Sequence, residues 1–285
     1  MSDSYYGRPI VKPHQWKPEI PLYFWLGGVA GASSTACILA RVCGRHELAR
    51  VYKRVALGGA MIAPVLLISD LGVRHRFYNM FRVFKPTSPM SVGSWLLAAF
   101  GGAVASSTAA EFLGWDVASV GTEAIAAILG PGLATYTAVL ISNTATPVWH
   151  EARGELPFVF AASSIAGAGA LAVLFAPSTE AGSARRAMIA GGIALEVAMR
   201  SMQASIGKAL AEPFRTGKAG GFQSLSTLLG MAAIGLGMLG KRRRKMSCAA
   251  ACLTIAAGIY ERFAILEAGK QSATDPKYVV ESQRS

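Results

Sequence analysis

Charge is scarce in this sequence of 285 residues. Asp, Glu, Lys and Arg together make up 15% of the chain, whereas hydrophobic residues make up 52% and the mean hydropathy is +0.39. A soluble domain typically has about 25% charged residues, so this composition excludes a soluble enzyme. We expect one membrane domain with no soluble module appended.

Histidine is also rare. Its four copies, His14, His46, His75 and His150, all fall in predicted loops or tails. A membrane cytochrome b holds its haem between axial histidines of facing helices, so this placement predicts a chain without haem. Any electron transfer would need a redox group in another subunit.

Cysteine is equally rare. Cys37, Cys43, Cys248 and Cys252 include no CxxC pair. Iron–sulfur and zinc sites need convergent thiolates, so we expect no metal in this chain. The four thiols are interpreted as small packing residues.

Long apolar runs dominate what is present. Each is close to the ~20 residues that a helix needs to cross the hydrocarbon core of a membrane. The pattern predicts an all-α integral membrane protein with eight transmembrane helices in bundles. We expect an N-terminal segment over 1–22, a transmembrane domain over 23–266 and a C-terminal tail over 267–285. The runs are 23–43, 53–70, 92–114, 122–142, 156–176, 187–207, 223–240 and 246–266.

The net charge of +12 could indicate nucleic acid. The basic residues, however, lie between the apolar runs, which favours an orientation signal over nucleic-acid binding. Short loops with clustered Lys and Arg stay in the cytoplasm, and here these are 41–54, 177–186 and 240–246. The pattern predicts a cytoplasmic (inner) membrane protein with both termini outside.

Polar residues gather at the predicted outer ends of the runs. Glu19 precedes the first run and Asp70 ends the second, while Tyr136 lies about two turns below the outer end of the fourth. Arg74 follows Asp70 at the spacing of a helical ion pair. Tyr23 and Trp25 could flank a flat ring or belong to an interfacial aromatic belt.

Each of these residues also has a structural explanation. Glu19 could cap a helix, Asp70 and Arg74 could form a structural ion pair, and Tyr136 could be a core residue. Together, however, a carboxylate, a phenol and aromatic walls at the edge of the hydrocarbon suit a quinone headgroup. The residues therefore favour a quinone site on this face.

Deeper polar residues suggest a second role. Glu196 and Arg200 lie one turn apart in the sixth run, and we expect them to face the bundle interior and pair. With Glu111 near the cytoplasmic end of the third run, they could relay protons toward Asp70 or Glu19. A static Glu196–Arg200 strut explains the pair equally well.

Several stretches resemble the NrfD/polysulfide reductase membrane-subunit family, in the family's order and over almost the whole chain. The most specific piece is Ser88-Pro89-Met90-Ser91. The matching stretches are Trp16–Gly28, Asp70–Gly72, Arg82–Trp95, Tyr136–Thr137, Pro147–Trp149, Leu156–Phe160 and Arg262–Pro276.

The resemblance implies a haem-free, eight-helix anchor that exchanges electrons between menaquinone or ubiquinone and a partner. In the family the partners are a four-cluster iron–sulfur subunit and usually a molybdopterin catalytic subunit. Glu19, Asp70 and Tyr136 match family positions at the quinone site, which lies where the iron–sulfur subunit docks. We expect docking on the loop from Gly72 to Met90, through Arg82, Lys85, Ser88, Pro89 and Met90.

Two other functions fit the same composition. A secondary transporter also carries charges at membrane depth, but its spans are typically interrupted around a central site. Pro131-Gly132 in the fourth run is the only such signal. A purely structural anchor would not need the cluster of Asp70 and Tyr136.

Overall fold

The computed structural model describes residues 11, 12 and 16–282. This part of the chain folds into long helices joined by short helical segments. His14 lies outside the described residues. The long helices are α1 (Glu19–Val42), α2 (His46–Asp70), α3 (Pro89–Phe112), α4 (Asp116–Ser142), α6 (Leu156–Phe175), α7 (Ala181–Ser205), α9 (Gly217–Leu239) and α10 (Arg244–Thr274). The short ones are η1 (Arg74–Phe81), α5 (Pro147–Glu151), η2 (Ala152–Gly154), α8 (Gly207–Ala211), η3 (Glu212–Phe214), η4 (Gly240–Arg242) and α11 (Pro276–Ser282).

Seven of the described helices are long and apolar enough to cross a membrane. The eighth long helix, α7, has 25 residues but carries Arg185, Arg186, Glu196 and Arg200. The prediction of an all-α membrane protein is confirmed. Each predicted run corresponds to one long helix.

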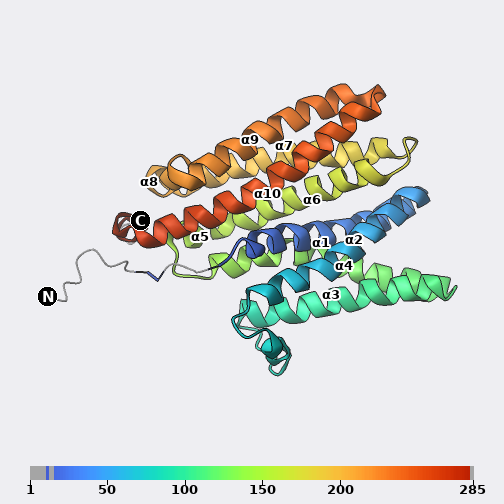
Figure 1. The fold of residues 1–285 in the computed structure, drawn as a ribbon, viewed down its shortest axis with the longest axis horizontal. Coiled ribbons are helices and arrows are strands. Elements are labelled where there is room, and N and C mark those ends of the chain that lie inside the picture. The colour runs from blue at the N-terminus through green and yellow to red at the C-terminus, as the bar shows by residue number, and fades with distance from the viewer. Residues whose placement is uncertain (1–10, 13–15, 283–285) are drawn as a thin grey trace, which may run out of the picture.

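The long helices form two groups of four (Figure 1). Helices α1 to α4 pack together in one bundle, and α6, α7, α9 and α10 form the second. Helix α1 contacts both bundles, because it packs on α2 and α4 and also on α6 and α10.

Successive long helices run in opposite directions, so the connections alternate between two ends of the molecule. We call one of these ends the terminal end (Figure 1). Helix α1 begins there, and the short helices at this end are η1, α5, α8 and α11. The opposite turn end carries the short connections 43–45, 113–115, 176–180 and 240–243. Three of these connections lie in or overlap the basic loops 41–54, 177–186 and 240–246 that the sequence assigns to one side of the membrane, and many of the Lys and Arg of those loops belong to the adjoining helix ends.

Glycine allows α1 and α4 to cross closely. A Cβ at Gly31 would lie 2.3 Å from the carbonyl oxygen of Gly130, and one at Gly130 would lie 2.4 Å from that of Gly31. Ser34 Oγ also donates to the Ala126 carbonyl at 3.0 Å. Small residues at such crossings are typical of membrane helices.

Helix α4 continues through Pro131 because α1 compensates for the missing bond. Proline cannot donate to the carbonyl four residues earlier, which here belongs to Ala127. That carbonyl instead accepts a hydrogen bond from Thr35 Oγ1 of α1 at 3.0 Å. The interruption that would suggest a transporter is therefore not formed in this helix.

Two boundaries differ from the predicted domains. Helix α1 begins at Glu19, inside the predicted N-terminal segment, and α10 continues to Thr274, eight residues beyond 266. The added turns of α10 are stabilised by tertiary contacts rather than hydrophobicity. Gly269, for example, lies so close to the Trp149 ring that a Cβ there would be 2.0 Å from it.

Candidate functional site

A cavity of about 200 Å³ opens at the terminal end of the first bundle. It combines a carboxylate, two phenols and aromatic walls, and draws on α1 to α4 and the segments beside them. Its lining consists of Trp16, Ile20, Tyr23, Phe24, Leu67, Asp70, Leu71, Met80, Met90, Ser94, Tyr136 and Leu140. Four of the site residues predicted from the sequence, Tyr23, Asp70, Met90 and Tyr136, meet here.

Asp70 reaches the cavity as the last residue of α2. Its Oδ1 accepts a hydrogen bond from the backbone N–H of Lys17 at 3.2 Å, which links α2 to the segment before α1. Within the described residues no ion pair joins Asp70 to Arg74, which is exposed at the start of η1 and does not line the cavity. The predicted i,i+4 pair needs another helical turn, but the chain becomes extended at Leu71.

The two tyrosines enter from different helices. Tyr23 is 1% exposed, and its hydroxyl has no hydrogen-bond partner in the described part of the chain. Tyr136 stands against α3 at Gly93, where a Cβ would lie 2.2 Å from its ring. A buried phenol without a partner is free to bind a ligand oxygen.

Aromatic rings form part of the cavity wall. Trp16 is stacked on Trp149 of α5 at a ring distance of 5.7 Å and meets Phe24 edge-on at 6.0 Å. Trp149 in turn donates from Nε1 to the carbonyl of Ile265 in α10 at 2.8 Å. The cavity wall is thereby tied to the second bundle.

Besides Arg74, two further predicted residues of the quinone site, Glu19 and Trp25, do not line the cavity. Glu19 is half-buried at the start of α1 and does not line the cavity; its Oε2 is buried and accepts no hydrogen bond from any described residue. Trp25 is packed between α6 and α10, beside Gly167 and Gly258. Residues two apart on a helix point about 200° apart, so Tyr23 and Trp25 cannot both face one cavity.

The segment expected to dock a partner is largely exposed. Arg82 and Lys85 are exposed, and Ser88 and Pro89 begin α3 as its N-cap and first residue. Met90 is 60% exposed although it also lines the cavity. This segment therefore forms the rim of the cavity.

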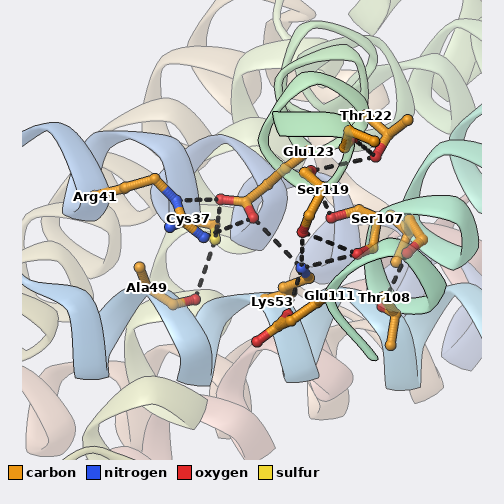
Figure 2. A network of polar contacts seen from close by, with 12 residues as sticks. Cys37, Arg41, Ala49, Lys53, Ser107, Thr108, Glu111, Ser119, Thr122 and Glu123 are labelled. Atoms are coloured by element: carbon orange, nitrogen blue, oxygen red, sulfur yellow. Dashed lines mark hydrogen bonds and ion pairs between the residues drawn. The ribbon is translucent and has the colours of Figure 1, made fainter. Parts of the chain in front are cut away.

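A second polar cluster lies at the turn end of the same bundle (Figure 2). Glu123 of α4 is 3% exposed and accepts from Arg41 Nε at 3.0 Å and from Arg41 Nη2 at 2.9 Å. Lys53 Nζ lies 2.5 Å from Glu111 Oε2 and 3.6 Å from Glu123 Oε2. Cys37 Sγ also donates to Glu123, at 3.0 Å.

The cluster joins one residue or more from each of α1, α2, α3 and α4. Ser107 and Ser119 add a reciprocal pair, since each hydroxyl donates to the other's carbonyl at 3.0 Å. Arg41 and Lys53 were interpreted from the sequence as loop charges; they instead partner acids inside the bundle. Glu123 was missed, although a carboxylate two residues into an apolar run was the available signal.

The predicted Glu196–Arg200 pair is not formed. Glu196 is half-buried and faces α9 near Gly230, whereas Arg200 is exposed, and no ion pair joins these two described residues. The long arginine side chain extends away to the surface, as such residues do near helix ends. Glu196 belongs to the second bundle and Glu111 to the first, and a proton relay through them stays a prediction.

The fully buried ion pair is instead Glu261–Arg262 in α10. Arg262 Nη1 donates to Glu261, its Nη2 donates to the Phe160 carbonyl at 3.2 Å, and its guanidinium covers the Phe160 ring at 3.7 Å. Sequence reasoning used Arg262 only within a family stretch and missed Glu261. Two adjacent charges inside the run 246–266 were the signal.

Comparison with known proteins identifies the family of this chain. No curated protein matches the chain significantly. A family model described as polysulfide reductase, of the NrfD type, matches residues 2–275. Because this match covers nearly the whole chain, the protein belongs to the NrfD/polysulfide reductase family of membrane subunits.

Proposed function

We propose that this chain is the quinone-reactive membrane anchor of a respiratory oxidoreductase complex in the cytoplasmic membrane. The observation that carries the proposal is the cavity that places Asp70, Tyr23 and Tyr136 together at the terminal end. Family membership supports the role of membrane anchor. Menaquinone or ubiquinone would be the ligand, and no haem would be needed in this chain.

The lining suits a quinone ring. Ile20, Phe24 and Leu67 offer apolar walls, and the tyrosine hydroxyls can hydrogen-bond the two ring oxygens. In quinol oxidation the ring loses two protons and two electrons. Asp70 would accept the two protons in succession as general base, releasing each to water at the terminal end, and the two electrons would pass to an iron–sulfur cluster of the partner subunit. In quinone reduction the same groups would act in reverse.

Partner docking is proposed on the rim segment around η1. This segment projects from the bundle (Figure 1) and exposes apolar side chains, including Tyr78 at 56% and Phe84 at 58%. Exposed apolar surface next to basic residues is typical of an interaction site. A four-cluster iron–sulfur subunit docked there would sit over the cavity, with a molybdopterin catalytic subunit beyond it.

The test is Asp70→Asn in the assembled complex. Asparagine keeps the size and can still accept from the Lys17 N–H, but it removes the base. We expect quinol-dependent turnover to fall by about 10²–10⁴-fold. Assembly, and activity with an artificial donor that bypasses this subunit, should be retained.

The matched control is Asp116→Asn, because Asp116 is an exposed acid at the turn end. It should turn over quinol like the wild type. If Asp70→Asn lowers only the amount of assembled complex, with normal turnover per complex, Asp70 is structural and the chain is an anchor without quinone chemistry at this site.

A further inference from the structure

A groove larger than this cavity lies on the side of the protein that would face the lipid, where the two bundles meet. Its volume is about 310 Å³, and α1 lines it between α4 on one side and α6 and α7 on the other. Small residues create the space: Ala32, Ala36, Ala134, Ala161, Ala168 and Ala187 all line it. The groove shares no lining residue with the cavity at the terminal end.

The groove faces hydrocarbon. Helices α1, α4 and α6, which form most of its walls, are long and apolar enough to cross a membrane, and the bordering Leu39 and Ile165 are 61% and 47% exposed. Its two threonines are satisfied within the protein: Thr35 donates to the Ala127 carbonyl and Thr135 to the Pro131 carbonyl. The threonine protons are therefore not available to a ligand, and the largely apolar lining suits an unbranched apolar chain.

The groove approaches a basic surface at the turn end. Ala187 shares one face of α7 with Ser183, because residues four apart align on a helix, and the adjoining Arg186 lies next to that face. Ser183 Oγ accepts from Arg45 Nη1 at 2.5 Å, and Arg186 is exposed. The nearby Glu180 carboxylate accepts from the Leu48 N–H. The Arg45 guanidinium thus lies one helical turn beyond Ala187 toward the turn end, and the exposed Arg186 adjoins Ala187 in the sequence.

We propose that this groove binds one acyl chain of an anionic phospholipid, whose headgroup lies at Arg45 and Arg186. The lipid belongs to the leaflet at the turn end and fills the junction between the bundles. The proposed lipid site is the same whichever side of the membrane the turn end occupies. The basic residues at the groove's end favour an anionic lipid over a quinone tail or a second copy of this chain.

The experiment compares lipids retained by the purified protein. The full chain is reconstituted in bilayers with equal amounts of phosphatidylglycerol and phosphatidylcholine, extracted in mild detergent and examined by native mass spectrometry. We expect the wild type to retain one phosphatidylglycerol. Ala187→Phe should lose it, whereas Val197→Phe, on the same helix but 62% exposed and outside the groove, should keep it.

A charge variant separates the headgroup from the chain. Arg186→Gln should still retain a lipid, but its preference for phosphatidylglycerol should fall about fivefold, as expected for ~1 kcal/mol per basic residue at a membrane surface. Arg54→Gln, an exposed arginine of α2, should not change it. This variant also keeps the test valid if Ala187→Phe does not fold.

Three results would overturn the proposal. The first is a wild type without retained lipid, or equal retention by Ala187→Phe. The second is an unchanged lipid preference in Arg186→Gln. The third is a quinone, or a dimer, that is retained in place of lipid and lost in Ala187→Phe, which would assign the groove to that occupant.

Discussion

At the scale of single residues, Gly93 determines where the Tyr136 ring can stand. A Cβ at position 93 would lie 2.2 Å from one ring carbon and 2.7 Å from the next. Since the ring lines the cavity, any larger residue at position 93 must move it. The phenol that we assign to quinone binding thus depends on the absence of a side chain on the facing helix.

We therefore expect Gly93→Ala to lower quinol-dependent turnover by about 10²-fold, the effect of displacing a binding group by roughly 1 Å. Steady-state kinetics of the assembled complex would show this loss. Gly101→Ala is the matched control on the same helix, because no atom lies within 4 Å of a Cβ there. Wild-type kinetics in Gly93→Ala would show that Tyr136 does not contribute to quinone binding.

At the scale of helices, Glu123 connects the ends of α1 and α2 to α4. It neutralises Arg41 directly and faces Lys53, which Glu111 holds from α3. Removing one member of a buried ion pair leaves a charge without compensation, which costs about 3–5 kcal/mol.

Glu123→Gln should accordingly lower the thermal stability of the protein and its amount in membranes, measured by a fluorescence-detected melting curve in detergent. Glu47→Gln provides the comparison, because Glu47 pairs with Arg50 at the surface and surface pairs contribute about 0–1 kcal/mol. Equal melting temperatures for the two variants would show that the cluster does not stabilise the bundle.

The helices themselves could be predicted well from the sequence, since length and apolarity determine a membrane span. The helix ends could not. Contacts with α5 extend α10 as far as Thr274. Helix α2 ends at Asp70 because the chain becomes extended at Leu71. Such effects depend on neighbours that a linear pattern does not contain.

The candidate site was partly predictable for a similar reason. Asp70 and Tyr136 were expected together, with Tyr23 as a possible ring wall, because all three fall at the predicted outer ends of their spans. Trp25 and Arg74 were assigned by nearness along the chain, and helical rotation and the end of α2 place both outside the cavity. Glu123 and Glu261 were missed because the apolar residues around them dominate the pattern.

At the scale of the whole molecule, the basic turn end predicts the orientation in the membrane. Both termini should lie outside the cell, because short basic loops stay in the cytoplasm. In a background with its native cysteines replaced, Ser2→Cys or Ser285→Cys should react with an impermeant maleimide in intact cells.

The native Cys43 supplies the opposite reporter, since it is exposed in the turn after α1. A variant that keeps only Cys43 should react after lysis and not before. The reverse pattern at the three positions would place the cavity and the proposed partner on the cytoplasmic side.

The central position of α1 also has a consequence for biosynthesis. Among the eight long helices described, α1 is synthesised first, yet it contacts α10, which is synthesised last. The Trp25 indole, for example, packs against Gly258. Helix α1 must therefore wait in the membrane until α10 has been synthesised. Until α10 arrives, a face of α1 remains accessible to lipid and to the cell's quality control, so a chain shortened before α10 would be recognised as unfinished even with its first bundle complete.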